Sequence, residues 1–280
     1  MKKWICLILV LSLSLSFVAC TDKAATDDIE PVTAEVEETQ AAEEETEEVQ
    51  TGNEGDAPVF VADDYDEVGT CGESLQWGYK KATGELIIIG SGEMDDYTAE
   101  KPAYWDGLVI RSVEIYGADT IGEYAFCDSE RLATVYASDT LTDIGISAFE
   151  HCGTLRSVTL YEGVTSIGDS AFEHCGSLAD LTIPDSVTNI GYYAFYDCDS
   201  LTTVTIPSGV KAVVDQSFSY CNALTSVTIP ESVTTVGISA FEGCTALTDL
   251  YYGGTQQQWA TTELGANSYV LNAVTIHCNG

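Results

Sequence analysis

Basic side chains are scarce in this sequence. Its 280 residues include ten lysines and arginines against 45 aspartates and glutamates, which gives a formal net charge of −35. Nucleic acids, heparin-like polyanions and anionic lipid surfaces are bound through clusters of lysine and arginine, and the sequence contains no such cluster. It therefore predicts no nucleic acid partner. Basic proteins, neutral glycans and weakly held Ca²⁺ are compatible with the charge, although a general role in solubility explains it more simply.

Catalytic and metal-ligating groups are also sparse. The chain has three histidines, and no Ser-His-Asp grouping, phosphate-binding loop or pair of facing carboxylates stands out. His151 and His174 each lie in the sequence Glu-His-Cys-Gly. We expect their rings to lie about 5 Å apart at the surface while the adjoining cysteines point inward, so that neither a zinc site nor a Cys-His nucleophile forms. The sequence predicts a protein that is not an enzyme and has no catalytic residue, cofactor or metal.

The sequence has, instead, an internal repeat with a period of 23 residues. Self-similarity at this period is typical of a solenoid, in which stacked coils bury one another's apolar faces. A leucine ladder and several aliphatic ladders share the period. Function is therefore expected on a surface. Phenylalanine marks each copy, at Phe126, Phe149, Phe172, Phe195, Phe218 and Phe241.

Each coil contains one predicted strand. Leu201, Val204 and Ile206 flank two threonines in the period-two pattern of a strand with one buried face. Stacked coils would place these strands about 4.8 Å apart, as a parallel sheet along one side of the solenoid. The segment around Phe172 lacks this alternation, and we expect either a helical turn or a tight arc there.

The residues from Leu178 to Cys198 read Leu-x-x-Leu-x-Ile-Pro-x-x-Val-x-x-Ile-Gly-x-x-Ala-Phe-x-x-Cys. This pattern resembles the BspA-like leucine-rich repeat of bacterial surface proteins, and the likeness extends as repeats from Leu108 to Tyr252. The resemblance implies a strand-dominated α/β solenoid with a cap at each end. It also implies a non-catalytic surface module that adheres to or binds extracellular proteins or glycans. The alternative is a structural spacer or envelope component without a specific ligand.

The beginning of the chain predicts its location. Lys2 and Lys3 precede an apolar run that ends in Phe17-Val18-Ala19-Cys20, and these are the parts of a secretory signal. Because the final cysteine resembles a bacterial lipoprotein processing site, residues 1–19 are predicted to be removed and Cys20 to carry the lipid. The mature chain would then lie on the outer face of the bacterial cell membrane, in contact with it only through the anchor. Ordinary secretion is the alternative.

The rest of the chain divides by composition. Residues 20–66 hold 17 acidic residues against Lys23 and few large apolar side chains, which predicts a disordered acidic linker. Residues 67–107 are predicted to form an N-terminal cap, 108–252 the repeats and 253–280 a C-terminal cap. The signal carries +2 and the linker −16, which leaves −21 on residues 67–280.

Alternation and capping signals predict the structure of both caps. Apolar residues alternate on either side of a turn at residues 81–84, which predicts a β-hairpin over the first coil. At the other end, Thr255 is the predicted N-cap of a short helix, and residues 274–276 are expected to form a final strand. Trp259 is expected to continue the aliphatic ladder formed by Ile144, Ile167, Ile190, Val213 and Val236.

Ten cysteines would ordinarily suggest disulfides in a secreted chain. Side chains that project in parallel from successive coils do not give disulfide geometry, so the repeated cysteines are predicted to stack as buried, small apolar residues. The pairing of Cys71, Cys127 and Cys278 is left open, and disulfide formation among them is allowed. The repeated cysteines are Cys152, Cys175, Cys198, Cys221 and Cys244.

One position of the repeat is glycine in most coils, but Val214 replaces it in the coil that leads to Phe218. A valine there indicates that the position does not need a positive φ, and we expect close packing to be the reason for glycine. The glycines are Gly145, Gly168, Gly191 and Gly237.

The exposed face of the strands is the predicted binding face, although the strand propensity of threonine accounts for its composition at least as well. The arcs that carry Tyr192, Tyr193, Tyr196 and Tyr220 are a second candidate surface, because exposed tyrosines often anchor contacts. The candidate residues of the strand face are Thr159, Asp180, Thr182, Thr203, Thr205, Thr228, Tyr136 and Tyr251.

Overall fold

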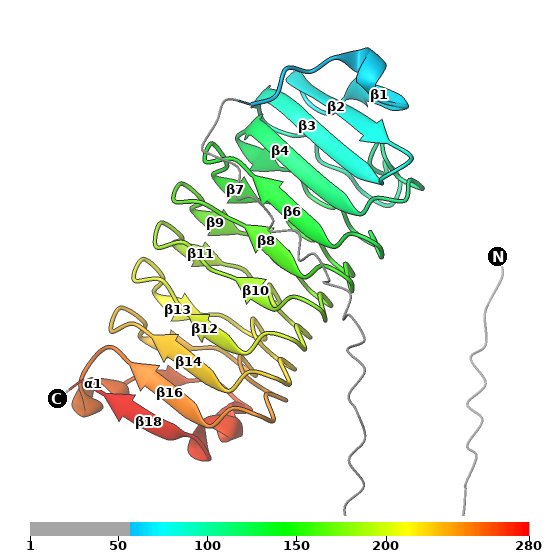
Figure 1. Cartoon of the computed structure of the whole chain (residues 1–280). Helices are drawn as coiled ribbons and strands as arrows, with labels where there is room; N and C mark the ends of the chain where they lie inside the picture. The colour runs from blue at the N-terminus through cyan, green and yellow to red at the C-terminus, as the bar shows by residue number, and fades with distance from the viewer. Residues whose placement is uncertain (1–56, 280) are drawn as a thin grey trace, which may run out of the picture. The chain divides into compact units, whose positions relative to one another are not determined.

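The computed structural model describes residues 57–279, which lie in one compact unit, Glu54–Gly280. The predicted signal, Cys20 and most of the predicted acidic linker lie outside the described residues. After a short 3₁₀ turn, η1 (Ala62–Asp64), the chain enters a cap and then winds through stacked coils (Figure 1). Among residues 57–279, no helix is long and apolar enough to cross a membrane.

The predicted N-terminal hairpin is confirmed. Strand β2 (Ser74–Lys80) pairs antiparallel with β3 (Glu85–Gly92), and β1 (Glu67–Thr70) pairs antiparallel with the other edge of β2. The turn between β2 and β3 contains Gly84 at φ +79°, a conformation that glycine adopts without strain. Leu75, Trp77 and Ile88 are buried on the inner face of the hairpin, which therefore covers the first coil.

The predicted parallel sheet of the coils is also confirmed. Strand β3 pairs parallel with β4 (Ser112–Ala118), and the main strand of each later coil pairs parallel with its predecessor, except that β12 begins a second sheet. These strands are β6 (Thr134–Ala137), β8 (Ser157–Thr159), β10 (Asp180–Leu181), β12 (Thr203–Thr205), β14 (Ser226–Ile229), β16 (Asp249–Tyr252) and β18 (Thr275–Cys278).

Each coil supplies a second strand, whereas we expected one. These strands are only two residues long, too short to show an alternating pattern, and each except the last places one aliphatic residue in the core, whereas Leu264 of the last strand is exposed. Together they form a second parallel ladder, behind the main strands in Figure 1. They are β5 (Thr120–Ile121), β7 (Asp143–Ile144), β9 (Ser166–Ile167), β11 (Asn189–Ile190), β13 (Ala212–Val213), β15 (Thr235–Val236) and β17 (Glu263–Leu264).

Of the two expectations for the segment around each phenylalanine, the structure has the tight arc. In the repeats the arcs contain turns and no helix. Each arc has two residues with positive φ, four positions apart, as at Ser170 (φ 55°) and His174 (φ 59°). Its amides donate to the arc of the next coil, for example from Phe172 N to the carbonyl oxygen of Ala194 at 2.8 Å. These intercoil bonds hold a backbone conformation that is costly for residues other than glycine.

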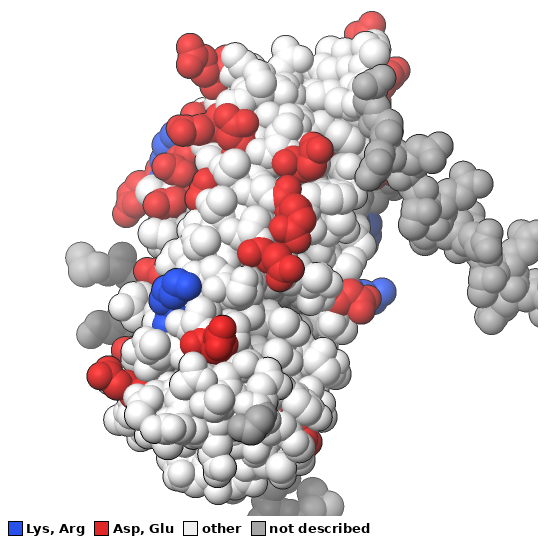
Figure 2. Space-filling view, turned by 90° about the vertical axis from the view of Figure 1, so that its left-hand side faces the viewer, with Lys and Arg blue, Asp and Glu red and all other residues white. Residues whose placement is uncertain are grey.

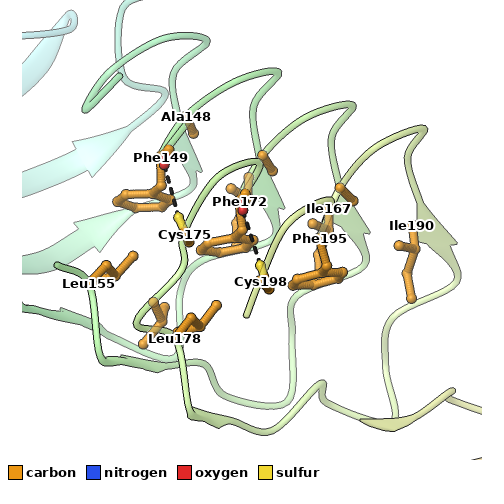
Figure 3. Packing of buried hydrophobic residues seen from close by; sticks show 14 of the residues in the cluster. Ala148, Phe149, Leu155, Ile167, Phe172, Cys175, Leu178, Ile190, Phe195 and Cys198 are labelled. Atoms are coloured by element: carbon orange, nitrogen blue, oxygen red, sulfur yellow. Dashed lines mark hydrogen bonds between the residues drawn. The ribbon is translucent and has the colours of Figure 1, made fainter. Parts of the chain in front are cut away.

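The core consists of ladders of identical or similar apolar side chains. The six repeat phenylalanines are each at most 2 % exposed, and consecutive rings stack with centroids 5.2–5.8 Å apart (Figure 3). Trp105 stacks on Phe126 at 5.3 Å and extends this ladder into the N-terminal cap. Each coil therefore buries its phenylalanine only when a neighbour supplies the second face, which is why the array needs caps.

Close packing accounts for the repeated glycine, as predicted. Gly168 does not have a positive φ, and a Cβ placed on it would lie 2.8 Å from the carbonyl carbon of Gly145 in the preceding coil. A Cβ placed on Gly191 would lie 2.4 Å from the backbone nitrogen of Asp169. A side chain at this position therefore forces two coils apart.

Where Val214 occupies this position, the strand ladders are interrupted. In residues 57–279, β10 is not hydrogen-bonded to β12, and β11 is not hydrogen-bonded to β13. In the next coil, three amides at equivalent positions donate hydrogen bonds to the preceding coil. At this step the corresponding amides, those of Thr202, Lys211 and Val214, make no such bond. The arcs remain joined across this step, with Phe195 N donating to Ser217 O at 2.9 Å. We call this step the seam.

The C-terminal cap has the predicted short helix and final strand. Thr255 caps α1 (Gln256–Trp259) by accepting a hydrogen bond from the amide of Gln258, whose side chain accepts in return from the amide of Thr255. The expected position of Trp259 in the aliphatic ladder is wrong. Leu264 of β17 pairs with Val236 there, while Trp259 packs against Tyr252. The 3₁₀ turn η2 (Ser268–Asn272) then leads to β18.

Candidate binding surfaces

Two files of side chains face outward from the main strands. In the first, Tyr136 of β6 lies beside Thr159 of β8, and beyond the seam Thr205, Thr228 and Tyr251 lie side by side on β12, β14 and β16. In the second, Asp180 of β10 lies beside Ser157. We call these two files the outer strand face. Since residues i and i+2 point to the same side of a strand, each main strand contributes one residue to each file.

The structure brings the predicted face residues together on this one surface. Seven of the eight are exposed, and Tyr136 is partly buried. Thr182 follows β10 directly and Thr203 begins β12, so the seam runs between them. No helix in residues 57–279 covers the strands (Figure 1). The face is therefore open and polar, with small side chains along its middle.

An aromatic cluster that the sequence analysis missed lies at the N-terminal end of this face. Tyr116 and Tyr161 flank Tyr136, with ring centroids 5.3 and 6.1 Å away. The hydroxyl of Tyr116 donates to Glu114 Oε2 at 3.1 Å, and burial together with this carboxylate raises the pKa of Tyr116. Tyr161 follows soon after the strand that carries Thr159, so a search of strand ends for aromatic residues would have found it.

A second aromatic pair lies at the C-terminal end of the outer strand face. The sequence analysis identified Tyr251 of this pair but missed His277. The ring of His277 stacks on Tyr251 with centroids 4.6 Å apart, and its Nε2 lies 2.7 Å from Asp249 Oδ1. The hydrogen bond from His277, followed by one from Thr248, lowers the pKa of the Asp249 carboxyl. A histidine outside the repeats gave no periodic signal, and only the pairing of β16 with β18 brings it here.

The arcs form a separate candidate surface. His151 and His174 stack with centroids 4.8 Å apart, which confirms the expected spacing, and Tyr196 and Tyr220 continue the row at 5.5 and 5.3 Å. We call these four residues the arc strip. Tyr192 and Tyr193, the other predicted arc tyrosines, are 50 % and 37 % exposed, and Tyr193 contacts Tyr196.

Each imidazole of the arc strip has a carboxylate partner. His151 Nδ1 lies 3.1 Å from Asp128 Oδ1, and His174 Nδ1 lies 2.8 Å from Asp197 Oδ2. The two rings thus stack on each other while each contacts a carboxylate on its other side. The adjoining cysteines are buried in the core, as expected.

The repeated cysteines form a buried ladder with a hydrogen bond in every coil. Cys175 Sγ donates to the carbonyl oxygen of Phe149 in the preceding coil at 3.1 Å (Figure 3), and the other four cysteines make the same bond to the phenylalanine of the preceding coil. Burial raises the pKa of Cys175 to about 12. Each thiol thus adds a hydrogen bond between coils to a carbonyl group, and the carbonyl oxygens of Phe126, Phe149 and Phe172 also accept from a backbone amide. The other four are Cys152, Cys198, Cys221 and Cys244.

No disulfide forms among the eight cysteines of residues 57–279. Cys71 is fully buried under the hairpin, and burial raises its pKa to about 12. In the same part of the chain, no three His, Cys, Asp or Glu side chains come close enough together to hold a metal ion.

The fold and its open faces define a leucine-rich repeat solenoid. Residues 119–248 match the BspA type leucine rich repeat region in six copies. This region of the chain is therefore similar to the BspA-type leucine-rich repeats. No curated protein matches the chain.

Several solved structures are similar to this chain. A leucine rich repeat protein from T. pallidum is 27 % identical over 70 % of this chain and 85 % of its own, with a TM-score of 0.48. A leucine rich cell surface protein from Faecalibacterium prausnitzii is 29 % identical over 69 % of this chain and 56 % of its own, with a TM-score of 0.44. A leucine-rich repeat protein from Eubacterium ventriosum is 23 % identical over 66 % and 72 %, with a TM-score of 0.45.

Proposed function

We propose that this chain is a cell-surface binding module that attaches to extracellular proteins or glycans through its outer strand face. The observation that carries the proposal is the open face itself, where seven of eight predicted residues are exposed and aromatic clusters lie at both ends. Small hydroxyl side chains supply hydrogen bonds, and tyrosines supply large contact areas at low entropic cost.

The proposal includes a lipid anchor at Cys20, after removal of residues 1–19, which would place the solenoid on the outer face of a bacterial membrane. Its support is the order of charged, apolar and small residues before Cys20. Radiolabelled palmitate incorporated by the wild type and not by Cys20→Ala supports the anchor. Equal labelling of both proteins contradicts it.

Binding to arrays of glycans and extracellular matrix proteins tests the outer strand face. The test variant carries Thr182→Ala, Thr205→Ala and Thr228→Ala. Its matched control carries Thr202→Ala, Thr234→Ala and Thr245→Ala, three exposed threonines outside the two files and without side-chain hydrogen bonds. Saturable binding that the test variant loses and the control keeps supports the proposal. Absence of binding above background overturns it and favours a structural spacer.

A further inference from the structure

A cleft of about 680 Å³ lies between the N-terminal cap and the first arcs, away from the residues of the outer strand face. One wall is the segment from Tyr97 to Ile110, which joins the hairpin to the first coil, and the other wall includes Tyr124, Asp128 and His151. A cleft of this volume accommodates a long side chain together with part of its backbone.

The cleft is strongly acidic. Four carboxylates line it, and Arg131 is the one guanidinium among its lining residues. These carboxylates come from both walls, so a cation in the cleft would meet negative charge from two sides. The carboxylates belong to Asp106, Asp128, Glu130 and Glu150.

The arc strip leads directly out of this cleft. His151 lines the cleft and stacks on His174, which in turn contacts the edge of Tyr196. Tyr220 is the last residue of the strip, and its ring packs against Gly243. A Cβ added to Gly243 would lie 2.6 Å from the ring of Tyr220. Because neighbouring coils hold these rings in place, little side-chain freedom is lost when a ligand covers them.

We propose that the cleft and the arc strip together form a binding site for a cationic peptide segment of a partner protein, with an arginine or lysine side chain in the cleft. Carboxylates pair with a guanidinium through two parallel hydrogen bonds, and aromatic faces attract a cation placed over them. The next residues of the segment would lie along His174, Tyr196 and Tyr220.

Charge favours this occupant over two others. A second copy of the chain would bring another strongly acidic surface against the cleft, since residues 67–280 carry −21. A neutral glycan would stack on the tyrosines but would leave the four carboxylates without a counter-charge. Asp and Glu also greatly outnumber Lys and Arg on the side of the molecule in Figure 2, so a cationic segment is attracted over a wide area.

The test must separate this site from diffuse attraction to an acidic protein. The probe is a fluorescein-labelled octapeptide of alternating arginine and glycine, titrated by fluorescence anisotropy with the full-length protein at physiological ionic strength. The test variant is Asp106→Asn with Glu130→Gln. The control variant is Asp185→Asn with Glu231→Gln, two exposed carboxylates that do not line the cleft and make no side-chain hydrogen bond.

Both double variants raise the net charge by the same amount. We expect the affinity to fall about tenfold in the test variant and about twofold at most in the control. Tyr220→Ala should weaken binding by about fivefold, while Tyr251→Ala, an exposed tyrosine of the outer strand face, should leave it unchanged. Urea midpoints equal to that of the wild type show that every variant is folded.

Four results overturn the proposal. One is equal loss of affinity in the test and control variants, which would indicate diffuse attraction. Another is an anisotropy signal that does not saturate. The third is displacement of the peptide from the wild type by a neutral hexasaccharide. The fourth is self-association of the wild type that only the cleft variant loses. The threonine triple variant of the outer strand face should bind the peptide normally, so failure at one surface is distinguishable from failure at the other.

Discussion

Val214 lies one coil after Gly191 at the same position of the repeat, and the strand ladders on both sides of the solenoid are interrupted between these two coils. Every glycine at this position lets its coil approach the preceding backbone to a distance that a Cβ would not allow. A half-buried valine therefore accounts for the seam, because its side chain occupies the space in which the coils would otherwise meet.

The seam should be visible in amide hydrogen exchange. Thr202, Lys211 and Val214 should exchange at least about 100-fold faster than Thr225, Thr234 and Gly237, which are their equivalents one coil later. The reason is that the later three amides donate to the preceding coil at 2.9, 3.1 and 2.7 Å, whereas the first three make no such bond. Exchange measured residue by residue with NMR checks this, and equal protection in the two sets contradicts the seam.

Close packing at the repeated glycine can be tested with two alanine substitutions. Gly168→Ala should lower the free energy of unfolding by about 2–3 kcal/mol, because its Cβ would meet backbone atoms at 2.8 Å. Gly176→Ala should change it little or raise it by about 0.5 kcal/mol, since nothing lies within 4 Å of the added Cβ and the unfolded chain loses freedom. Urea denaturation measures both. Similar values for the two variants would mean that packing does not explain the glycine.

Much of this fold could be predicted because each ladder of the core repeats the same side chain or one of similar shape and polarity. The phenylalanine, leucine and cysteine positions, the main strands and the hairpin all follow from periodicity that packing enforces in every coil. The second ladder could not be predicted in this way, since strands of two residues such as β7 contain no alternation. The short helix of the C-terminal cap was predicted because Thr255 and Gln258 form a local capping signal.

The candidate surfaces were predictable only in part, for a physical reason. Thr205 and Thr228 share a repeat position, so their neighbourhood follows from the period. Tyr161 and His277 lie outside the periodic strand positions, and the cleft is built from the irregular segment that ends at Ile110. Contacts between a repeat and a non-repeating segment depend on the path of the chain, which a periodic pattern does not specify.

The pKa of Asp249 offers a test of the C-terminal end of the outer strand face. Its carboxyl pKa is lowered in the folded chain, first by the hydrogen bond from His277 and then by that from Thr248. Because the pKa of this carboxyl is lower in the folded chain than in the unfolded chain, the ionised carboxylate stabilises the fold at pH values above the unfolded-state pKa. This contribution is lost as the pH falls through the folded-state pKa. His277→Ala should return the pKa towards its ordinary value, and Thr248→Ala should do so to a smaller extent. Carboxyl NMR titration measures the shift, and an unchanged pKa in His277→Ala would refute the assigned cause.

The cysteines differ in burial, and this predicts the order in which they react. In the folded protein at mildly alkaline pH, iodoacetamide should modify Cys278, which is partly exposed, before any other cysteine of residues 57–279. Cys127 should react slowly, because burial and then the carboxylate of Asp128 raise its pKa to about 12. Cys175 and the rest of the ladder should remain unmodified until urea unfolds the chain, since the thiolate is the reactive form and the thiols are buried. Pulse labelling followed by peptide mass spectrometry assigns each site, and modification of the ladder before Cys278 would contradict the buried, hydrogen-bonded arrangement.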